Sequence, residues 1–389
     1  MSAITEINIY PIKSTAGLSV SRTWVDDLGL SFDRRFVVTD ANGKFITSRT
    51  HPALCLVQVH LVPEGFVLNA PNMRTLRIDY RTLSQEYRNV EVWSSAIDGQ
   101  YCNENCDLWF SQYLNQDCKL FYFGAQSKRH VKNSSSQVGF ADGYPVLLIS
   151  EASLNDLNLH AKQNFTMSRF RPNLVVNNCQ PFEEDTWRHI RIGEVEFEVS
   201  KPCSRCIFTT VDPLNGNFHP DKEPIKTLAN FRQVAGGDVM FGQNLIPLNQ
   251  GSIKQGDRVE VLAKQEPPRF LKPKPKAGTA RVTPKKQLAN EIKEANDMEA
   301  RKAVSLVFNK WNKHVIGNNQ TTILEQGEDA GLILPFSCRA GMCGRCKIKL
   351  ESGDVKQLAT DGLTQQEQND GYILACSCLP KSDVVLASN

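Results

Sequence analysis

The sequence predicts a β-rich protein of the α+β class that is divided into several domains. Short strand-like runs separated by turn residues fill residues 1–262, as in FVVTDANGKFI (36–46) and GEVEFEVS (193–200). Helical patterns are fewer, and the clearest covers residues 151–162, with Ser150 as the candidate N-cap. The chain has 389 residues. Because one hydrophobic core rarely grows past about 250–300 residues, more than one domain is expected.

The composition is that of an ordinary folded protein. Hydrophobic residues make up 41% and charged residues 22% of the chain, which excludes extensive disorder. The formal net charge of +3 is too close to neutral for a protein that binds nucleic acid by bulk charge. The sequence shows no signal-peptide pattern and no apolar run near the ~20 residues that a membrane helix needs. We therefore expect a cytoplasmic protein with no membrane partner, whose 12 cysteines are reduced and whose cysteine clusters indicate metals or catalysis.

The composition changes near residue 263. Residues 264–289 hold five prolines and eight basic residues against one acidic residue, a pattern typical of an extended linker. A basic docking strip is the alternative interpretation. The predicted organisation is an N-terminal domain over 1–122, a second domain over 123–263, a Pro/Lys-rich linker over 264–302 and a C-terminal domain over 303–389.

The strongest motif is a cysteine cluster near the C-terminus. Its spacing is Cys338-x4-Cys343-x2-Cys346-x29-Cys376, which is typical of plant-type 2Fe–2S clusters held by four thiolates. A zinc site is the alternative, but its usual signature is two C-x2-C pairs. Cys378, two residues after Cys376, is expected to be an ordinary buried thiol.

The segment from PFSCRAGMCGRC to GYILACSCLP resembles 2Fe–2S ferredoxin domains, especially those fused to oxygenase reductases. The resemblance implies a β-grasp fold and one-electron transfer. Residues 300–389 carry ten basic and nine acidic residues, so bulk charge gives little reason to expect docking onto a basic reductase. Because a ferredoxin domain carries electrons and seldom consumes them, we expect their acceptor in residues 1–262.

A second cysteine pair lies in KPCSRCIFTTVDP (201–213), directly after a strand-like run. Cys203 and Cys206 admit three interpretations: half a zinc site, a dithiol redox pair, or one metal-binding thiolate beside a bystander. The neighbouring Lys201 and Arg205 favour the thiolate form, which suits a soft metal ligand. The spacing by itself does not distinguish Cys203 from Cys206.

Polar clusters interrupt the strand-like runs of the body. Together they supply Lys, Ser, Arg and Asn groups that suit an anionic phosphate. The clusters are YPIKS (10–14), FDRRF (32–36), FADGYP (140–145) and RFRPN (169–173).

Residues 1–262 resemble a MOSC protein with its N-terminal β-barrel domain. The resemblance rests on the four polar clusters above and on the motifs ADGYPVLLISEASL, KPCSRCIFTTVDP and FGQNL (241–245). The related types are the mitochondrial amidoxime-reducing component and the bacterial YcbX-type MOSC proteins fused to a ferredoxin. The resemblance implies a molybdenum–pyranopterin cofactor, with Cys206 binding the metal, Cys203 not binding it and Asp142 acting beside it. The residues that it implies for holding the pterin and its phosphate are Lys13, Ser14, Arg34, Arg171, Asn173 and Ser204.

The family chemistry implied by this resemblance is the reduction of N-hydroxylated compounds: hydroxylamines, amidoximes and base analogues such as N-hydroxylaminopurine, with a role in detoxification. Electrons are expected to pass from an NAD(P)H-dependent flavoprotein through the 2Fe–2S cluster to molybdenum, with the tethered ferredoxin domain moving between them. One alternative is sulfur transfer to a metallocofactor through a Cys206 persulfide. Another is a pure electron-transfer module in which the body is only a docking scaffold.

Overall fold

The computed structural model describes residues 1–161, 163–271, 302–332, 334–335, 344–358, 360 and 362–387. The chain divides into two compact units: Met1–Val234 with Val239–Leu271, and Ala235–Asp238 with Lys272–Asn389. Both units are rich in strands, which confirms the predicted β-rich α+β class. The predicted linker beyond Leu271 and the predicted iron ligands Cys338 and Cys343 lie outside the described residues.

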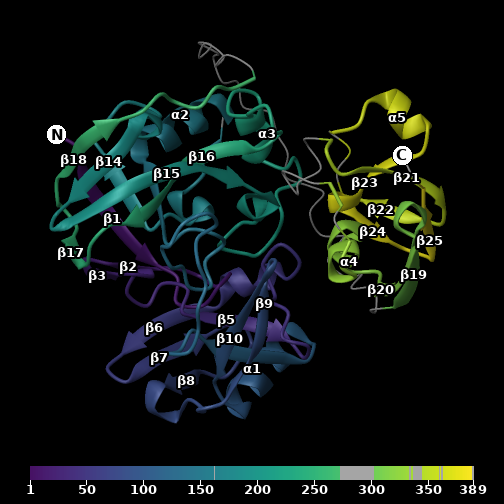
Figure 1. Cartoon of the computed structure of the whole chain (residues 1–389), viewed down its shortest axis with the longest axis horizontal. Coiled ribbons are helices and arrows are strands. Elements are labelled where there is room, and N and C mark those ends of the chain that lie inside the picture. The colour runs from purple at the N-terminus through teal and green to yellow at the C-terminus, as the bar shows by residue number, and fades with distance from the viewer. Residues whose placement is uncertain are drawn as a thin grey trace. The chain divides into compact units, whose positions relative to one another are not determined.

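The largest sheet of the first unit has eight strands (Figure 1). Neighbouring strands are antiparallel except for β12 (Val146–Ser150) and β13 (Leu174–Asn177), which are parallel. Apolar side chains buried against this sheet include Ile7, Leu148, Leu174 and Phe197. The strand order is β18 (Val259–Lys264), β14 (Trp187–Ile192), β15 (Val195–Arg205), β16 (Val239–Pro247), β12 (Val146–Ser150), β13 (Leu174–Asn177), β1 (Ala3–Ile9) and β2 (Leu18–Val20).

Strands from the start of the chain complete sheets formed by much later residues. β1 pairs with β13, and β3 (Arg22–Asp26) lies between β4 (Gly29–Leu30) and β17 (Gly251–Lys254) in a three-stranded sheet. Figure 1 shows the purple strands β1 to β3 next to teal and green strands. The YPIKS segment follows β1 directly, so this pairing brings it to the eight-stranded sheet.

The rest of the N-terminal half forms two smaller sheets around an aromatic core that includes Phe36, Phe66 and Phe110. The helix α1 (Glu104–Leu114) packs against β11 (Cys118–Tyr122). One sheet has the order β5 (Phe36–Asp40), β11 (Cys118–Tyr122), β10 (Ser95–Tyr101) and β9 (Tyr87–Val92). The other has the order β6 (Gln58–Val62), β7 (Gly65–Asn69) and β8 (Leu76–Asp79).

The predicted helix at 151–162 is α2 (Glu151–Ala161), and α3 (Ile225–Ala229) follows later in this unit. Ser153 N donates a hydrogen bond to Ser150 Oγ at 3.0 Å. An N-cap side chain makes this bond because the first amides of a helix lack partners within it. The predicted N-cap is therefore confirmed.

The strand predicted at 193–200 extends beyond the segment in which apolar and polar residues alternate. β15 runs to Arg205, and its register against β16 shifts at Val199/Lys201 and again at Pro202/Ser204. A short 3-10 helix, η5 (Ile207–Thr210), begins directly after Cys206. Both cysteines of the motif therefore lie where an irregular strand end meets a helix start.

The residues that follow β18 stay attached to the first unit. Gln265 N donates to Thr186 O at 2.7 Å, and Leu271 N donates to Gln233 O at 2.8 Å. Arg232 Cζ lies 4.2 Å from the centroid of the Phe270 ring. The first residues of the predicted linker, up to Leu271, thus pack against the body.

The second unit has the β-grasp arrangement expected of a ferredoxin domain, with the helices α4 (Ile323–Asp329) and α5 (Gln365–Asn369). Leu306, Phe308 and Leu374 are fully buried in its core. Its main sheet has the order β20 (Lys313–Asn318), β19 (Ala303–Phe308), β25 (Val384–Leu386), β21 (Lys347–Ser352) and β23 (Tyr372–Leu374). A two-stranded sheet pairs β22 (Val355–Gln357) with β24 (Cys378–Pro380). In the part of the chain that the structure describes, no helix has the length and apolarity needed to cross a membrane.

Candidate active site

Three predicted cofactor-binding residues have left-handed backbone conformations. Their φ angles are 73° at Ser14, 46° at Arg34 and 56° at Arg171. Such a conformation costs a non-glycine residue about 1–3 kcal/mol and persists only where the surroundings impose it. At Ser14 the carbonyl is held by Ser48 Oγ, which donates to it at 2.9 Å. Strain of this kind gathers at binding sites, so the three residues mark one candidate site.

Tyr10 brings two of these arginines together. The guanidinium carbons of Arg34 and Arg171 lie 4.4 Å and 4.1 Å from the centroid of its ring. The Tyr10 hydroxyl donates to Pro172 O at 3.2 Å, and burial raises the Tyr10 pKa to about 12. The ring is thus a neutral platform on which two cations are favourably placed.

Asn173 is fully buried, and its side chain is engaged within the protein. Its Oδ1 accepts hydrogen bonds from Arg34 Nη1 at 2.8 Å and from Leu147 N at 3.1 Å, and its Nδ2 donates to Asn8 O at 3.0 Å. Arg34 also pairs with Asp33 at 2.5 Å. The structure therefore gives Asn173 a clear part in orienting Arg34.

Lys13 and Asp142 form an ion pair with a separation of 2.5 Å between Nζ and Oδ1. Lys13 Nζ also donates to Phe140 O at 2.9 Å. Only 6% of the Lys13 side chain is exposed, against 67% for Asp142.

Burial lowers the Lys13 pKa to about 8, although the Asp142 carboxylate opposes this. Partial desolvation would raise the pKa of Asp142, but attraction to Lys13 and Arg49 outweighs it and holds that pKa well below its usual range. Asp142 is thus an ionised carboxylate that remains open to solvent.

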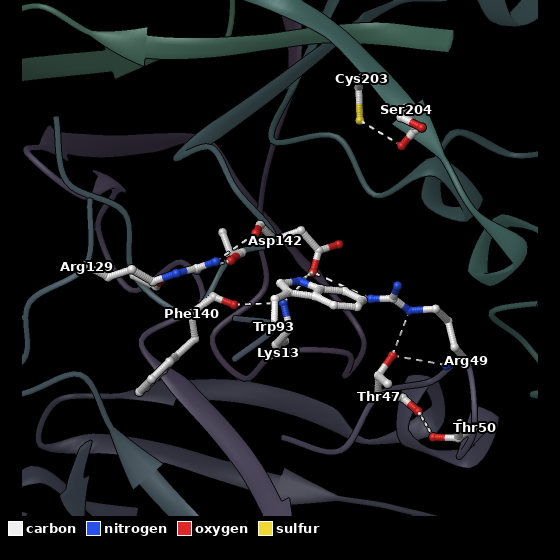
Figure 2. A network of polar contacts seen from close by, with 12 residues as sticks. Lys13, Thr47, Arg49, Thr50, Trp93, Arg129, Phe140, Asp142, Cys203 and Ser204 are labelled. Carbon is white, nitrogen blue, oxygen red and sulfur yellow. Dashed lines mark hydrogen bonds and ion pairs between the residues drawn. The ribbon is translucent and has the colours of Figure 1, made fainter. Parts of the chain in front are cut away.

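Three residues that sequence reasoning missed surround Asp142 (Figure 2). Trp93 Nε1 donates to Asp142 Oδ1 at 3.3 Å, and Arg49 Nη2 lies 3.8 Å from the same oxygen. The guanidinium of Arg129 donates to backbone carbonyls within residues 139–142 at 2.5–3.0 Å. None of the three belongs to a recognisable motif. The available signal was a bulky aromatic residue at the position that the structure shows to be the turn between β9 and β10, and such a residue alone does not indicate a site.

The first cysteine of the motif is engaged by its neighbours. Arg205 Nη1 donates to Cys203 Sγ at 3.0 Å, and Cys203 Sγ lies 3.7 Å from Ser204 O. Arg205 is buried and also donates to Phe170 O, at the end of the 3-10 helix η3 (Met167–Phe170). Of the two basic neighbours noted in the sequence, Lys201 instead lies over the Tyr144 ring at 5.3 Å.

The second cysteine occupies the N-cap position of η5 and is partly exposed. Its carbonyl accepts from Thr209 N at 3.0 Å and from Thr209 Oγ1 at 2.9 Å, while no hydrogen bond to its sulfur occurs among the described residues. Two residues later, the Phe208 ring lies 5.2 Å from the guanidinium carbon of Arg171. The structure thus brings the Cys206 segment next to the arginine pair on Tyr10.

In the second unit, two predicted iron ligands meet. Cys346 Sγ and Cys376 Sγ lie 3.1 Å apart, although 29 residues separate them in the sequence. Ala375 N donates to Cys346 O at 3.0 Å, which ties the two segments together. Cys378 is buried in β24 and burial raises its pKa to about 12, as expected for a core thiol.

Family models match the chain in three consecutive places. Residues 1–117 match the MOSC N-terminal beta barrel domain, residues 135–260 match the MOSC domain, and residues 310–381 match the 2Fe-2S iron-sulfur cluster binding domain. Mitochondrial amidoxime reducing component 2 of Bos taurus is 34% identical to this chain over 67% of this chain and 83% of its own length. Mitochondrial amidoxime-reducing component 1 of Homo sapiens is 31% identical over the same shares.

The chain belongs to the amidoxime-reducing component family. In this family member the 2Fe-2S domain match, residues 310–381, follows the two MOSC matches along the chain. The sequence prediction of a MOSC protein joined to a ferredoxin domain is confirmed.

Solved structures also show similarity to a small part of the chain. The ferredoxin reductase in carbazole 1,9a-dioxygenase is 24% identical over 23% of this chain and 28% of its own, with a TM-score of 0.22. Phthalate dioxygenase reductase is 27% identical over 23% of this chain and 27% of its own, with a TM-score of 0.21.

The residues of this family member fit a cofactor that joins an anionic phosphate to a soft metal. Arg171 Nη1 donates to Thr15 O at 2.5 Å, and no carboxylate pairs with Arg171 among the described residues. Desolvation lowers its pKa to about 10, because a half-buried guanidinium without a carboxylate partner is poorly solvated. Such a group favours an anion, and the Cys206 thiol is a soft ligand. The MOSC domain of this family binds the molybdenum cofactor, and the ferredoxin domain binds a 2Fe–2S cluster.

Proposed function

We propose that this protein reduces N-hydroxylated compounds, namely hydroxylamines, amidoximes and N-hydroxylated base analogues. One observation carries the proposal: the Cys206 segment, which follows the end of β15, lies next to Arg171. The guanidinium carbon of Arg171 is 5.2 Å from the centroid of the Phe208 ring. A metal-binding sulfur and an anion-binding arginine are the two contacts that a phosphate-bearing metal cofactor needs. The relatives in this family are named for amidoxime reduction.

The chain's own residues take three parts in this proposal. Cys206 binds the metal, while Arg205 keeps the neighbouring sulfur of Cys203 engaged away from it. The predicted cofactor-binding residues Lys13, Ser14, Arg34, Arg171 and Ser204 hold the pterin and its phosphate, and Asn173 supports them by orienting Arg34. Asp142 lies beside the metal, where its exposed carboxylate contacts the substrate.

The overall reaction consumes two electrons and two protons. R–NHOH + 2e⁻ + 2H⁺ gives R–NH₂ + H₂O, so the N–O bond breaks and its oxygen leaves as water. When bound, the molybdenum cofactor supplies the two-electron redox chemistry. Asp142, held ionised by Lys13 and Arg49, accepts hydrogen bonds from the N–H or O–H groups of the substrate.

The electron route extends the proposal. Cys338, Cys343, Cys346 and Cys376 would hold a 2Fe–2S cluster, which would supply one-electron transfer between an NAD(P)H-dependent flavoprotein and the molybdenum held by Cys206. The fused domain supports this route because Cys346 and Cys376 already lie together as a ligand pair would. The domain boundaries, the mobile linker, the cytoplasmic location and the role in detoxification stay predictions from the sequence. The relatives are named mitochondrial, which does not support the predicted cytoplasmic location.

Metal analysis and an N-reduction assay test the proposal together. Purified protein should contain molybdenum and pterin and should reduce N-hydroxylaminopurine, and Cys206→Ser should lose this activity while retaining the visible absorbance of the iron–sulfur cluster. Retained activity in Cys206→Ser would exclude its role as a ligand. Protein without molybdenum or pterin that carries a persulfide on Cys206 would favour sulfur transfer instead.

A further inference from the structure

The N-terminal half of the first unit reaches the candidate active site at the turn between β9 and β10. Trp93 occupies this turn with φ at 56°, a left-handed conformation that is costly for a bulky residue. Asp142, which it contacts, lies just before β12 in the MOSC region. Trp93 lies in the region that matches the MOSC N-terminal domain, and Asp142 lies in the region that matches the MOSC domain. A strained tryptophan that contacts a carboxylate of the other region indicates a functional constraint at this turn.

The contacts to Asp142 converge on one of its two oxygens. Lys13 Nζ at 2.5 Å, Trp93 Nε1 at 3.3 Å and Arg49 Nη2 at 3.8 Å all address Oδ1. Among the residues that the structure describes, no hydrogen bond to Oδ2 occurs, and 67% of the side chain is exposed. In Figure 2 the dashed lines meet at one carboxylate oxygen, while the other turns away from them. The carboxylate is therefore held by one oxygen and presents the other.

The two groups from the N-terminal half are themselves held in place. Arg49 Cζ lies 4.0 Å from the centroid of the Trp93 ring, and Arg49 Nε donates to Thr47 Oγ1 at 3.2 Å. The rings of Phe45 and Trp93 meet edge to face with their centroids 4.9 Å apart. Only 8% of the Arg49 side chain is exposed. Because these contacts fix the side chains of Trp93 and Arg49, the two residues can in turn fix the plane of the Asp142 carboxylate.

We propose that Trp93 and Arg49 are positioning residues that aim Asp142 Oδ2 at the substrate, where it accepts a hydrogen bond from the N–OH or N–H group of an N-hydroxylated compound. This inference rests on the proposed function. A carboxylate that already points in the bound direction loses less rotational freedom when the substrate arrives, which strengthens binding and improves alignment for reaction. The N-terminal half of the unit thus contributes directly to substrate recognition.

The geometry can be tested without any turnover. In full-length protein labelled with ¹⁵N-tryptophan, the indole N–H signal absent from Trp93→Phe identifies Trp93 among the five tryptophans. Asp142→Ala should shift that signal upfield, because the hydrogen bond to a charged oxygen is lost. The signal of Trp109, whose Nε1 donates to Arg74 O at 2.6 Å, should stay in place. An unmoved Trp93 signal in Asp142→Ala would overturn the positioning role.

The functional part is tested by a double-mutant cycle with N-hydroxylaminopurine as substrate. Trp93→Phe and Arg49→Gln should each lower kcat/KM about tenfold, with molybdenum content and cluster absorbance unchanged. Each should change kcat/KM by less than about twofold when added to Asp142→Asn, because positioning residues act through their partner. Trp24→Phe and Arg77→Gln, on exposed side chains away from this cluster, serve as controls.

The outcomes separate this inference from the proposed function. Additive losses in the Asp142→Asn background would show that Trp93 and Arg49 act independently of Asp142, and would overturn the inference while leaving N-reduction intact. A wild-type protein that contains molybdenum but does not reduce N-hydroxylaminopurine would contradict the proposed function and the substrate part of the inference, and the indole spectrum would still decide whether Trp93 positions Asp142.

Discussion

Arg205 donates a hydrogen bond from its guanidinium to Cys203 Sγ at 3.0 Å. The same guanidinium donates to the carbonyl of Phe170. Arg205 is buried, so both contacts are shielded from water. This relationship distinguishes two cysteines that look equivalent in the sequence. The sulfur of Cys203 is engaged by the protein, whereas Cys206 directly precedes the 3-10 helix η5, whose Phe208 ring lies beside Arg171.

Replacing each cysteine in turn tests this distinction. We expect Cys206→Ser to lose molybdenum, because its sulfur is the proposed ligand. Cys203→Ser should retain more than about half of the molybdenum, since a supporting contact matters less than a ligand. The measurement is metal content per protein by mass spectrometry. If the metal is lost from Cys203→Ser and kept in Cys206→Ser, the assignment of the two cysteines must be reversed.

Removing the iron–sulfur cluster should separate electron delivery from reduction. Cys346→Ser takes away a sulfur that lies 3.1 Å from Cys376 Sγ, so the cluster absorbance and NAD(P)H-driven turnover should fall at least about tenfold. A dithionite-reduced viologen should still drive N-reduction. Cys378→Ala, at a buried cysteine outside the ligand pattern, is the matched control and should keep the absorbance. Full NAD(P)H-driven turnover without the cluster would exclude the proposed electron route.

A buried ion pair should be important for the stability of the first unit. Arg232 and Asp185 pair at 2.6 Å with both side chains nearly inaccessible, and Gln243 Nε2 donates to the same carboxylate at 2.6 Å. Asp185→Asn leaves the guanidinium without its counter-charge and should lower the free energy of unfolding by about 3–5 kcal/mol. The control Arg191→Gln breaks an exposed pair with Glu196 and should cost about 0–1 kcal/mol. Urea denaturation followed by circular dichroism measures both, and equal losses would contradict the prediction.

Glu184 should make stability fall as the pH rises. The side chain is buried, and burial raises its pKa above the ordinary value of 4.5, although Ser153 Oγ donates to it at 2.7 Å. Below pH 4.5 the carboxyl is protonated in both the folded and the unfolded state. As the pH rises from there through the raised pKa, the unfolded state gives up its proton first, so stability decreases by up to about 1.4 kcal/mol per unit of pKa shift.

Glu184→Gln removes this titration. The melting temperature of the variant relative to wild type should therefore increase between pH 4.5 and pH 8. Measuring the difference across pH cancels any constant effect of the substitution on packing. A difference that is flat or that decreases with pH would show that the carboxyl does not titrate as described.

Much of the fold could be predicted because it depends on local patterns. Alternating apolar residues predicted the strand at 193–200, and Ser150 marked the start of α2. The pairing of β1 with β13 could not be predicted this way, since it joins residues more than 160 positions apart and no local pattern encodes that partner. The extension of β15 to Arg205 was also missed, because two register shifts interrupt its alternation.

The candidate site divides in the same manner. YPIKS and RFRPN indicated Lys13 and Arg171, because they carry cationic groups that suit a phosphate. The CSRC spacing did not distinguish its two cysteines, and only the resemblance to MOSC proteins assigned Cys206. Asn173 was expected to hold the cofactor, and the structure shows its amide occupied with Arg34 and the backbone. Trp93 and Arg49 were missed because their significance arises only from contact with Asp142, which lies 49 residues beyond Trp93.

The sequence by itself determined the kinds of chemistry available to this protein: four cysteines spaced for two irons, a further thiol for a soft metal, and basic groups for an anion. Only the tertiary structure decided how these groups are aimed. Arg205 contacts one cysteine of the pair, and two hydrogen-bond donors and one ion-pair partner from distant segments hold one oxygen of Asp142. The physical reason is that ligand spacing is written along the chain, whereas orientation and burial depend on which remote strands pack together.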